Sequence, residues 1–289
     1  MINKLKDNAS LYINCIDYTV SKEIFELQRN SEYDLLITNP FPEDLSSYYE
    51  SEDYISHTDK SDSLIDKLYQ TVRNYTLKKK VKLINSFNTT NKKLLDIGCG
   101  TGDFLTVAQQ NNWTVKGVEP SEKARTIALE KKVIIKEDLN KIIDEKFDVI
   151  TLWHVLEHVE NLEEYIKKIK ELLSDNGTLI VAVPNFKSYD AQYYKNYWAA
   201  FDVPRHLWHF SKTSITKIFS SYDFSVEKIL PMKFDSFYVS MLSEKYKTGK
   251  INYFKAFYIG LRSNWYGKTK KEYSSHIYIL KKQNIKFKI

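Results

Sequence analysis

Three of the chain's eight glycines, Gly98, Gly100 and Gly102, fall within five residues, and Asp96 lies two residues before the first of them. Glycine adopts positive φ and leaves the backbone bare, so another molecule can approach the chain closely. An apolar pair precedes the aspartate and a helical pattern follows the last glycine. This order predicts a strand-to-helix turn, which is where α/β sheets hold ligands.

Two further acids follow predicted strands. Glu119 closes the next strand, and a carboxylate at that position can accept hydrogen bonds from the two hydroxyls of a ribose. Asp138 follows a weaker strand, where it could accept from an adenine amino group. Singly, each acid also fits a cap or a solvated charge. Together with Asp96 they favour a cationic cofactor that carries a ribose and no phosphates.

The spacing of the glycines separates this turn from other nucleotide sites. Dinucleotide-binding turns use Gly-x-Gly-x-x-Gly, so that a helix N-terminus meets a pyrophosphate, whereas here the pattern is Gly-x-Gly-x-Gly. The sequence also lacks Gly-x-x-x-x-Gly-Lys-Ser/Thr, which argues against a nucleoside triphosphatase.

Three histidines are candidate catalytic residues. His154 and His158 follow the fourth predicted strand four residues apart, so on a helical turn they share one face, and His206 lies in an aromatic-rich insertion. Imidazole is the side chain suited to take a proton from a hydroxyl near neutral pH. The alternative for each is a structural hydrogen bond. The pattern His-Glu-x-x-His is absent and Glu157 directly precedes the second histidine, so no metal is expected.

Residues 94–102, Leu-Leu-Asp-Ile-Gly-Cys-Gly-Thr-Gly, resemble the first motif of class I S-adenosylmethionine-dependent methyltransferases. Residues 115–121 resemble the second motif, with Glu119 at the ribose-binding position. Three later stretches are similar to the ubiquinone-biosynthesis-like (methyltransferase-23-like) branch of this family: residues 147–159, residues 179–185, and Pro204-Arg205-His206-Leu207 with Phe210-Ser211. The resemblance covers roughly residues 62–232.

The resemblance implies a methyltransferase that uses S-adenosylmethionine. The positions expected to bind this cofactor are Asp96, Gly98, Gly100, Gly102, Glu119, Asp138, Leu139 and Trp153. The expected acceptor is a small molecule, methylated at oxygen or, less favoured, at nitrogen or carbon. No Asn/Asp-Pro-Pro-Tyr/Phe follows the fourth strand, which argues against adenine-N6 or glutamine methylation. Methylation of nucleic acid or protein, and a cofactor-binding interaction protein without catalysis, are the alternatives.

Alternating strands and helices must position these residues. The expected fold is a Rossmann-like three-layer α/β/α sandwich, with a mostly parallel seven-stranded sheet and an antiparallel last strand. The predicted strands are residues 93–97, 114–119, 133–136, 147–152, 177–183, 225–230 and 275–280. The predicted helices are residues 62–87, 103–111, 121–131 and 162–173 (with Gly177 after its end), one that starts at Ser211, and an aromatic-rich helix within 234–265.

Four segments are expected along the chain. Residues 1–60 are predicted to be irregular and residues 61–90 to form a helix leading into the core. Residues 91–232 form the cofactor-binding core, with a substrate insertion at 186–210. Residues 233–289 form an aromatic and basic lid with the final strand.

The N-terminal segment carries a weaker resemblance. Cys15, Pro40-Phe41-Pro42 and Tyr48-Tyr49 resemble remnants of the zinc ribbon that begins some sugar and natural-product methyltransferases. The chain has only two cysteines, so no zinc is expected there. Tyr48, Tyr49 or Tyr54 could still fold over the cofactor or acceptor, with simple packing as the alternative.

Composition restricts the location and the partners. Mean hydropathy is −0.45 and no apolar run approaches 18 residues, so no membrane span is expected. The N-terminus has no apolar stretch typical of a secretory signal, and a cytoplasmic protein is predicted. From Ser243 onward the chain is basic, which fits a solvated lysine face or contact with an anionic partner. The aromatic and lysine-rich stretch 234–265 predicts a lid, a homodimer face or weak peripheral contact with an anionic membrane.

Overall fold

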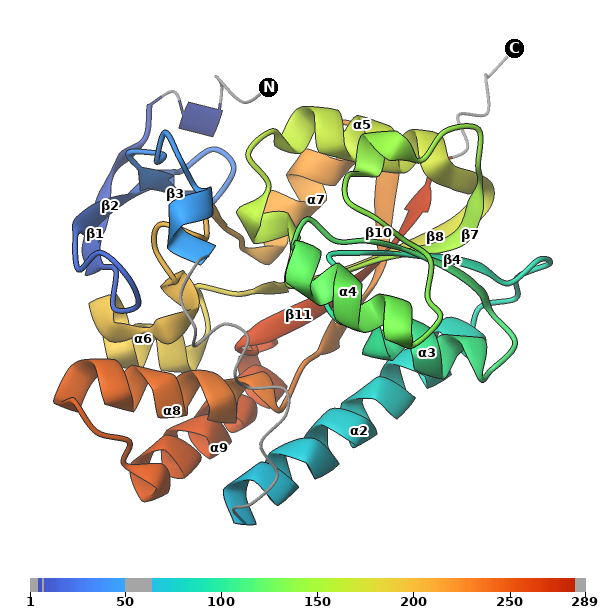
Figure 1. Ribbon diagram of the computed structural model, residues 1–289. Coiled ribbons are helices and arrows are strands. Elements are labelled where there is room, and N and C mark those ends of the chain that lie inside the picture. Colours follow the sequence, from blue (N-terminus) through green and yellow to red (C-terminus); the bar gives the residue numbers. More distant parts are fainter. Residues whose placement is uncertain (1–4, 7, 50–63, 284–289) are drawn as a thin grey trace.

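The computed structural model describes residues 5–6, 8–49 and 64–283 (Figure 1). A seven-stranded sheet forms its centre, in the order β10-β11-β8-β7-β4-β5-β6. Its strands are β4 (Lys93–Ile97), β5 (Thr114–Val118), β6 (Ile135–Lys136), β7 (Phe147–Trp153), β8 (Leu173–Pro184), β10 (Phe224–Pro231) and β11 (Ser275–Lys282).

The directions of the strands confirm the predicted fold. β4 pairs in parallel with β5 and β7, and the outer pairs β5–β6 and β7–β8 are also parallel. β11, the last strand among the described residues, runs antiparallel to both β8 and β10. The carboxyl ends of the parallel strands therefore meet along one edge of the sheet, where Asp96 and Trp153 lie.

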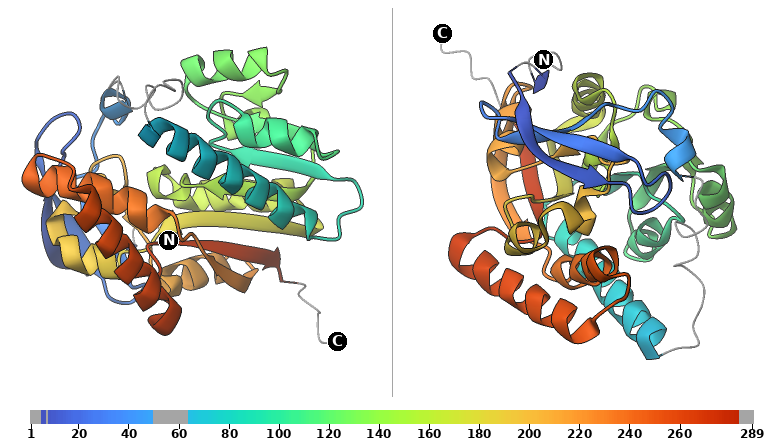
Figure 2. Two further views of the ribbon diagram at one scale, coloured as in Figure 1. Left: turned by 90° about the horizontal axis from the view of Figure 1, so that it is seen from below. Right: turned by 90° about the vertical axis from the view of Figure 1, so that its left-hand side faces the viewer.

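Helices cover both faces of this sheet (Figures 1 and 2). They include α2 (Leu64–Asn85), α3 (Asp103–Gln109), α4 (Glu122–Glu130), α5 (Leu162–Leu172) and α7 (Lys212–Ser220). Alternate strand residues face opposite layers, because side chains alternate along a strand. Leu95 and Ile150 pack into the cluster that contains α5 and α7, whereas Leu94 and Val149 pack with α2 and α3.

The strand β8 starts earlier than the sequence predicts. It begins at Leu173, directly after α5, and pairs there with Phe147 of β7. Gly177 therefore lies inside the strand and does not end the helix. A Cβ at Gly177 would lie 2.7 Å from the Leu173 side chain, so close packing accounts for the glycine.

The prediction of an irregular N-terminal segment is wrong for its described residues. β1 (Ser10–Ile16), β2 (Ile24–Asn30) and β3 (Leu35–Asn39) form an antiparallel sheet with β9 (Trp208–His209), seen on the left of Figure 1. These short strands are stabilised from outside the segment. Phe25 and Leu27 belong to a buried cluster with Phe186 and Trp198 of the insertion.

The aromatic stretch 234–265 forms two helices where the sequence predicted one. α8 (Asp235–Thr248) ends at Gly249, which has φ of 77°, and α9 (Tyr253–Lys270) starts after the Asn252 cap. A left-handed glycine after a helix is a common stop signal. Both helices pack beside α6 (Tyr189–Tyr194), as Figure 1 shows.

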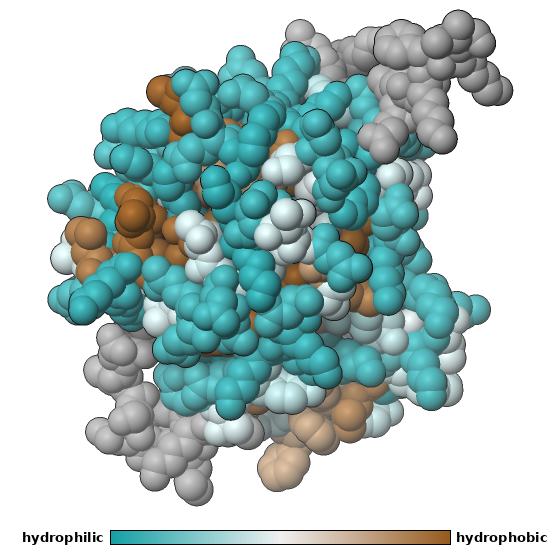
Figure 3. Space-filling view, turned by 90° about the vertical axis from the view of Figure 1, so that its right-hand side faces the viewer, coloured by the Kyte–Doolittle hydropathy of each residue, from teal (hydrophilic) through white to brown (hydrophobic). Residues whose placement is uncertain are grey.

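The surface differs from one region to another. The face drawn in Figure 3 is mostly hydrophilic, with hydrophobic side chains only in scattered groups. Helix α9 instead exposes a row of apolar side chains at helical spacing: Phe254, Phe257, Tyr258, Leu261 and Trp265. Among the described residues, no helix combines the length and the apolar character that crossing a membrane requires.

Candidate active site

The glycine-rich turn has the geometry that the sequence predicts. It joins β4 to α3, and Gly98, Gly100 and Gly102 have φ of 68°, 54° and 76°. A Cβ at Gly98 would lie 2.3 Å from the Val155 side chain, so Gly98 permits close packing against the segment after β7. A Cβ at Gly100 would meet no atom of the described chain within 4 Å. The backbone at Gly100 is therefore open to a ligand.

Glu119 lies directly against this turn. Its Oε2 accepts a hydrogen bond from the Gly100 N–H and its Oε1 accepts one from the Ser121 N–H, both at 2.9 Å. The side chain is buried, and each carboxylate oxygen keeps a further lone pair for a hydroxyl donor. This arrangement fits a ribose diol beside the open backbone of Gly100.

Asp138 and Leu139 are held differently. Asp138 is exposed, and its Oδ1 accepts from the Asn140 N–H at 2.6 Å, so it caps the short turn η4 (Leu139–Lys141). Leu139 is buried in the core cluster of α5 and α7. Asp138 thus serves as a cap, as the sequence also allowed. Contact of Asp138 or Leu139 with a cofactor stays a prediction.

Asp96 is a buried carboxylate beside the turn. It accepts a hydrogen bond from the Thr151 hydroxyl at 2.5 Å. Burial raises the pKa of Asp96 to about 7, with Glu119 adding to the rise and the Thr151 hydrogen bond and Lys80 opposing it.

Lys80 of α2 lies beside Asp96, a position that sequence reasoning missed. Its Nζ lies 4.2 Å from the ring centroid of Trp153. Burial lowers the pKa of Lys80 to about 8, against the attraction of Asp96 and Asp235. The sequence shows Lys80 only as one of three consecutive helical lysines, so no signal singles it out.

Trp153 ends β7 at the same edge of the sheet. Its Nε1 is buried and has no hydrogen-bond partner in the described chain. Buried N–H groups are rarely left unpaired, so this donor points to an additional group at the site. The open Gly100, the Glu119 carboxylate and the unpaired Trp153 N–H together fit a polar cofactor at this edge.

His154 is held between two carboxylates. Its Nε2 lies 3.0 Å from Asp235 Oδ2 and its Nδ1 lies 3.3 Å from Glu157 Oε1. Burial alone lowers the pKa of His154, but the two carboxylates outweigh it and raise the pKa to about 10. The ring is therefore protonated near neutral pH and has no lone pair with which to accept a proton.

His158 and His206 lie together instead. Their ring centroids are 4.5 Å apart and nearly perpendicular. Burial lowers the pKa of both rings, and for His206 the neighbouring His158 adds to the effect. Both imidazoles are therefore neutral at pH 7, which is the form that a general base or a metal ligand requires.

The prediction that His154 and His158 share a helical face is wrong. His154 has φ of 57°, and its N–H donates to the Ala182 carbonyl in continuation of the β7–β8 pairing. The helical turn η5 (Leu156–His158) begins only two residues later. The structure thus brings His158 to His206 and places His154 apart from them, against Asp235.

The Tyr48-Tyr49 segment reaches this site through one of its two residues. The Tyr49 hydroxyl lies 2.8 Å from His158 Nδ1, whereas the Tyr48 hydroxyl donates to Glu23 at 3.0 Å. Tyr54 lies outside the described residues. Burial raises the pKa of the Cys15 thiol to about 12, so Cys15 is a protonated, packed thiol.

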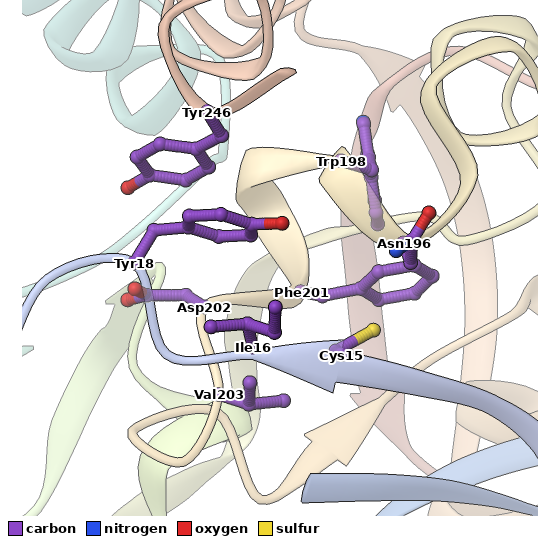
Figure 4. A pocket seen from close by; sticks show the side chains of 9 residues that line it. All are labelled: Cys15, Ile16, Tyr18, Asn196, Trp198, Phe201, Asp202, Val203 and Tyr246. Carbon is purple, nitrogen blue, oxygen red and sulfur yellow. The ribbon is translucent and has the colours of Figure 1, made fainter. Parts of the chain in front are cut away.

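A small pocket lies between β1, the insertion and α8 (Figure 4). Its walls come from β1, from the loop that precedes His206, and from α8, whose Tyr246 stacks on Tyr18 with ring centroids 4.6 Å apart. The lining residues are Cys15, Ile16, Tyr18, Asn196, Trp198, Phe201, Asp202, Val203 and Tyr246. Its volume is about 10 Å³. That is room for one water and not for an acceptor.

Comparison with known proteins places the chain among related sequences. Residues 69–229, more than half of the chain, match a family described as a methyltransferase domain. A ubiquinone biosynthesis O-methyltransferase from Histophilus somni (strain 2336) is 36% identical over 110 residues, which cover 33% of this chain and 46% of that protein. One from Pelagibacter ubique (strain HTCC1062) is 36% identical over 109 residues, covering 34% of this chain and 45% of that protein. The aligned part thus spans about half the length of these curated relatives.

A solved structure shows a similar fold. The magnesium protoporphyrin IX methyltransferase of Synechocystis PCC 6803, solved with bound SAH, superposes with a TM-score of 0.52. It is 18% identical, and the match covers 79% of this chain and 91% of that one. Similarity at this level shows the shared Rossmann-like architecture.

Proposed function

The chain belongs to the methyltransferase-domain family, and from that membership we propose that it transfers a methyl group from S-adenosylmethionine to a hydroxyl of a small-molecule acceptor. One observation carries the proposal above all. The turn after β4 leaves the Gly100 backbone open at positive φ, with the Glu119 carboxylate bonded to its N–H. Backbone and carboxylate together provide the surface that a ribose-bearing ligand needs.

The residues at this edge would hold the cofactor without moving a proton. Glu119 accepts from ribose hydroxyls, and the Trp153 N–H and the Asp96 carboxylate offer polar partners to the amino-acid end. Gly98 and Gly102 keep the turn in the shape that exposes Gly100. When bound, S-adenosylmethionine supplies a methyl group already activated by the positive sulfur. The protein therefore has to align donor and acceptor and to exclude water.

The acceptor side must manage a proton, because a hydroxyl carries one at pH 7. His158 and His206 are neutral, His206 is buried and His158 is partly buried, and each has one ring nitrogen free of hydrogen bonds within the described chain. We assign the proton-accepting role to this pair. His154, as a cation between Glu157 and Asp235, is proposed as a positioning residue.

Methylation at oxygen is favoured by two observations. The first is that the curated relatives, which align with about one third of this chain, are named O-methyltransferases. The second is the neutral imidazole pair, which can accept a proton. A hydroxyl acceptor needs such a base, whereas an unprotonated amine does not. The described N-terminal strands, the insertion 186–210 and helices α8 and α9 are proposed to enclose this acceptor.

The partners beyond the acceptor stay predictions. The exposed apolar row on α9 supports either weak peripheral contact with an anionic membrane or a homodimer face. A cytoplasmic location also stays a prediction.

Incubation with donor labelled in the transferred methyl group tests the proposal. The purified chain is mixed with a cell extract that is then separated into metabolite, lipid, RNA and protein fractions. We expect label in the metabolite or lipid fraction, with Glu119→Ala as the inactive control. Label confined to RNA or protein would support the alternative methylase, and no label in any fraction would support the interaction protein.

A further inference from the structure

Glu157 lies in a cluster with His158 and His206, two of the candidate catalytic residues, although no sequence pattern predicted that Glu157 joins them. One potential ligand atom from each residue lies within 4.8 Å of the others. Glu157 and His158 come from the turn η5 after β7, and His206 comes from the insertion. Glu157 and His206 are buried, and His158 is partly buried.

The hydrogen bonds of the two rings identify the nitrogen that each leaves free. His206 Nδ1 lies 3.0 Å from the Ala200 carbonyl oxygen, and His158 Nδ1 lies 3.1 Å from the Arg205 carbonyl oxygen. A carbonyl oxygen only accepts, so the proton of the His206 ring is on Nδ1 and its lone pair is on Nε2. For His158 the Arg205 carbonyl favours the same tautomer, in which the Tyr49 hydroxyl, 2.8 Å from Nδ1, accepts from the same N–H. No hydrogen bond joins either Nε2 to the described part of the chain, and the nearest carboxylate to His206 Nε2 is that of Asp202 at 3.7 Å.

Glu157 supplies an unpaired acceptor beside these nitrogens. Its side chain is 1% exposed, and its Oε2 has no hydrogen-bond partner among the described residues. Its other oxygen, Oε1, lies 3.3 Å from His154 Nδ1. A buried carboxylate oxygen without a partner is costly, and such a group calls for a specific explanation.

We propose that Glu157 Oε2, His158 Nε2 and His206 Nε2 bind a divalent transition-metal ion of the Zn²⁺ type. Two imidazoles and one carboxylate, with further positions open, form the ligand set of catalytic zinc and of related first-row metal sites. Imidazole disfavours Mg²⁺ and Ca²⁺, which take oxygen ligands. The carbonyl bonds at both Nδ1 atoms are the partners that orient metal-binding histidines.

The spacing agrees with such an ion. Ligand bonds of about 2.1 Å in a tetrahedral site place the ligand atoms about 3.4 Å apart. One ligand atom from each of the three residues already lies within 4.8 Å of the others, so side-chain rotations would have to close the remaining distance. The absence of His-Glu-x-x-His had predicted no metal. That pattern misses this cluster because His206 joins it from a distant part of the chain.

Binding of the ion does not depend on the proposed function. The catalytic role suggested for it does, because that role requires methyl transfer to a hydroxyl. An acceptor hydroxyl bound at an open position would lose its proton to solvent more readily, because the ion stabilises the resulting oxyanion. That oxygen then forms the new bond to the methyl carbon, while the carbon–sulfur bond breaks and sulfur keeps the electron pair. The ion would thus take over the task assigned above to free imidazole.

Titration with Co²⁺ alone tests the site, without cofactor or acceptor. The untagged full chain is treated with a chelator, dialysed and titrated while visible absorption is recorded. We expect one equivalent to bind with the d–d bands of four- or five-coordinate Co²⁺, and Zn²⁺ to displace it. Glu157→Gln and His206→Asn should each weaken binding at least tenfold. Glu160→Gln, which changes an exposed carboxylate three residues away, should leave binding unchanged.

Thermal unfolding of each metal-free variant shows whether it folds. If Glu157→Gln does not fold, His206→Asn and His158→Asn carry the test. Absence of a d–d spectrum in the wild-type chain, or equal affinity in folded wild-type and cluster variants, would overturn the proposal. Calorimetry with S-adenosylhomocysteine on the same samples separates the two claims. Cobalt binding without cofactor binding removes the proposed function and keeps the metal site, and the opposite pattern removes only the metal site.

Discussion

The proposed site has a donor side, the turn after β4 with Glu119, which would hold the methyl donor, and an acceptor side around His158 and His206. The two sides are built from different parts of the chain. On the donor side, Glu119 takes its protein hydrogen bonds from Gly100 and Ser121, all at the ends of two neighbouring strands. On the acceptor side, His158 meets Tyr49 from the N-terminal segment and the Arg205 carbonyl from the insertion. The proposed donor site is therefore built at the edge of the parallel sheet, whereas the proposed acceptor site combines the turn after β7 with the N-terminal segment and the insertion.

One buried carboxylate joins several of those segments. Asp190 of α6 accepts hydrogen bonds from Trp198 Nε1 at 2.7 Å, from the Ser263 hydroxyl at 2.5 Å and from the Ser274 hydroxyl at 2.7 Å. These donors belong to the insertion, to α9 and to the residue before β11. Asp190 thus anchors the acceptor side while lying outside the donor site.

The largest expected effect follows from Asp190→Ala. Three buried donors would lose their acceptor, and the free energy of unfolding should fall by about 3 kcal/mol. Denaturant titration measures this loss. Asp175→Ala, at an aspartate whose side chain is 96% exposed, is the control. If the two sides are independent, folded Asp190→Ala keeps wild-type affinity for S-adenosylhomocysteine, and a parallel loss of affinity would show that they are coupled.

Glu119→Ala should weaken S-adenosylhomocysteine binding by about 100-fold, because it removes the carboxylate that both holds the turn and faces the ribose. Asp138→Ala should cost less than tenfold, since Asp138 is exposed and its carboxylate already caps a turn. Calorimetric titration compares the two. Equal losses of affinity would contradict the claim that Glu119 contributes more to cofactor binding than Asp138.

A smaller effect concerns pH. Burial raises the pKa of Asp96 from 3.8 to about 7, so the folded state holds its proton more tightly than the unfolded state. The stability due to this group is present below pH 3.8 and is lost as pH rises through about 7. Asp96→Asn removes this dependence. The free energy of unfolding of the variant minus that of the wild type should therefore be about 2 kcal/mol more favourable at pH 7 than at pH 5.

Denaturant titrations of both proteins at the two pH values measure that difference, in a range below the pKa of about 8 of the neighbouring Lys80. An unchanged difference between the two pH values would mean that Asp96 is ionised throughout the range.

The donor side and the sheet could be predicted because their signals are local. The predicted strand at 93–97 has the observed bounds of β4, and the helices predicted from 121 and 162 are observed as α4 and α5, capped by Ser121 and Asn161. Apolar alternation, caps and glycine spacing act over a few residues. Such local signals can be found in a single sequence without knowledge of the tertiary structure.

The acceptor side could not be predicted because its partners are distant in sequence. β1 to β3 are short and are stabilised by packing on the insertion, which no local pattern reveals. Helical spacing misplaced His154, because its positive φ depends on pairing with β8. The approach of Glu157 to His206 likewise follows from how turn and insertion pack. On the donor side, the approach of Lys80 to Trp153 was missed for the same reason, because it depends on how α2 packs against the sheet.

The central claim, that the turn after β4 holds the cofactor, is tested most directly by calorimetry with S-adenosylhomocysteine on two alanine variants. Gly100 and Gly249 have φ of 54° and 77°, and a Cβ at either meets no described atom within 4 Å. Both substitutions therefore cost a similar strain of about 1 to 2 kcal/mol, but only Gly100 lies beside Glu119. We predict wild-type affinity for Gly249→Ala and a loss of at least 30-fold for Gly100→Ala. Equal affinity in the two variants, or no binding by the wild-type chain, would contradict the account.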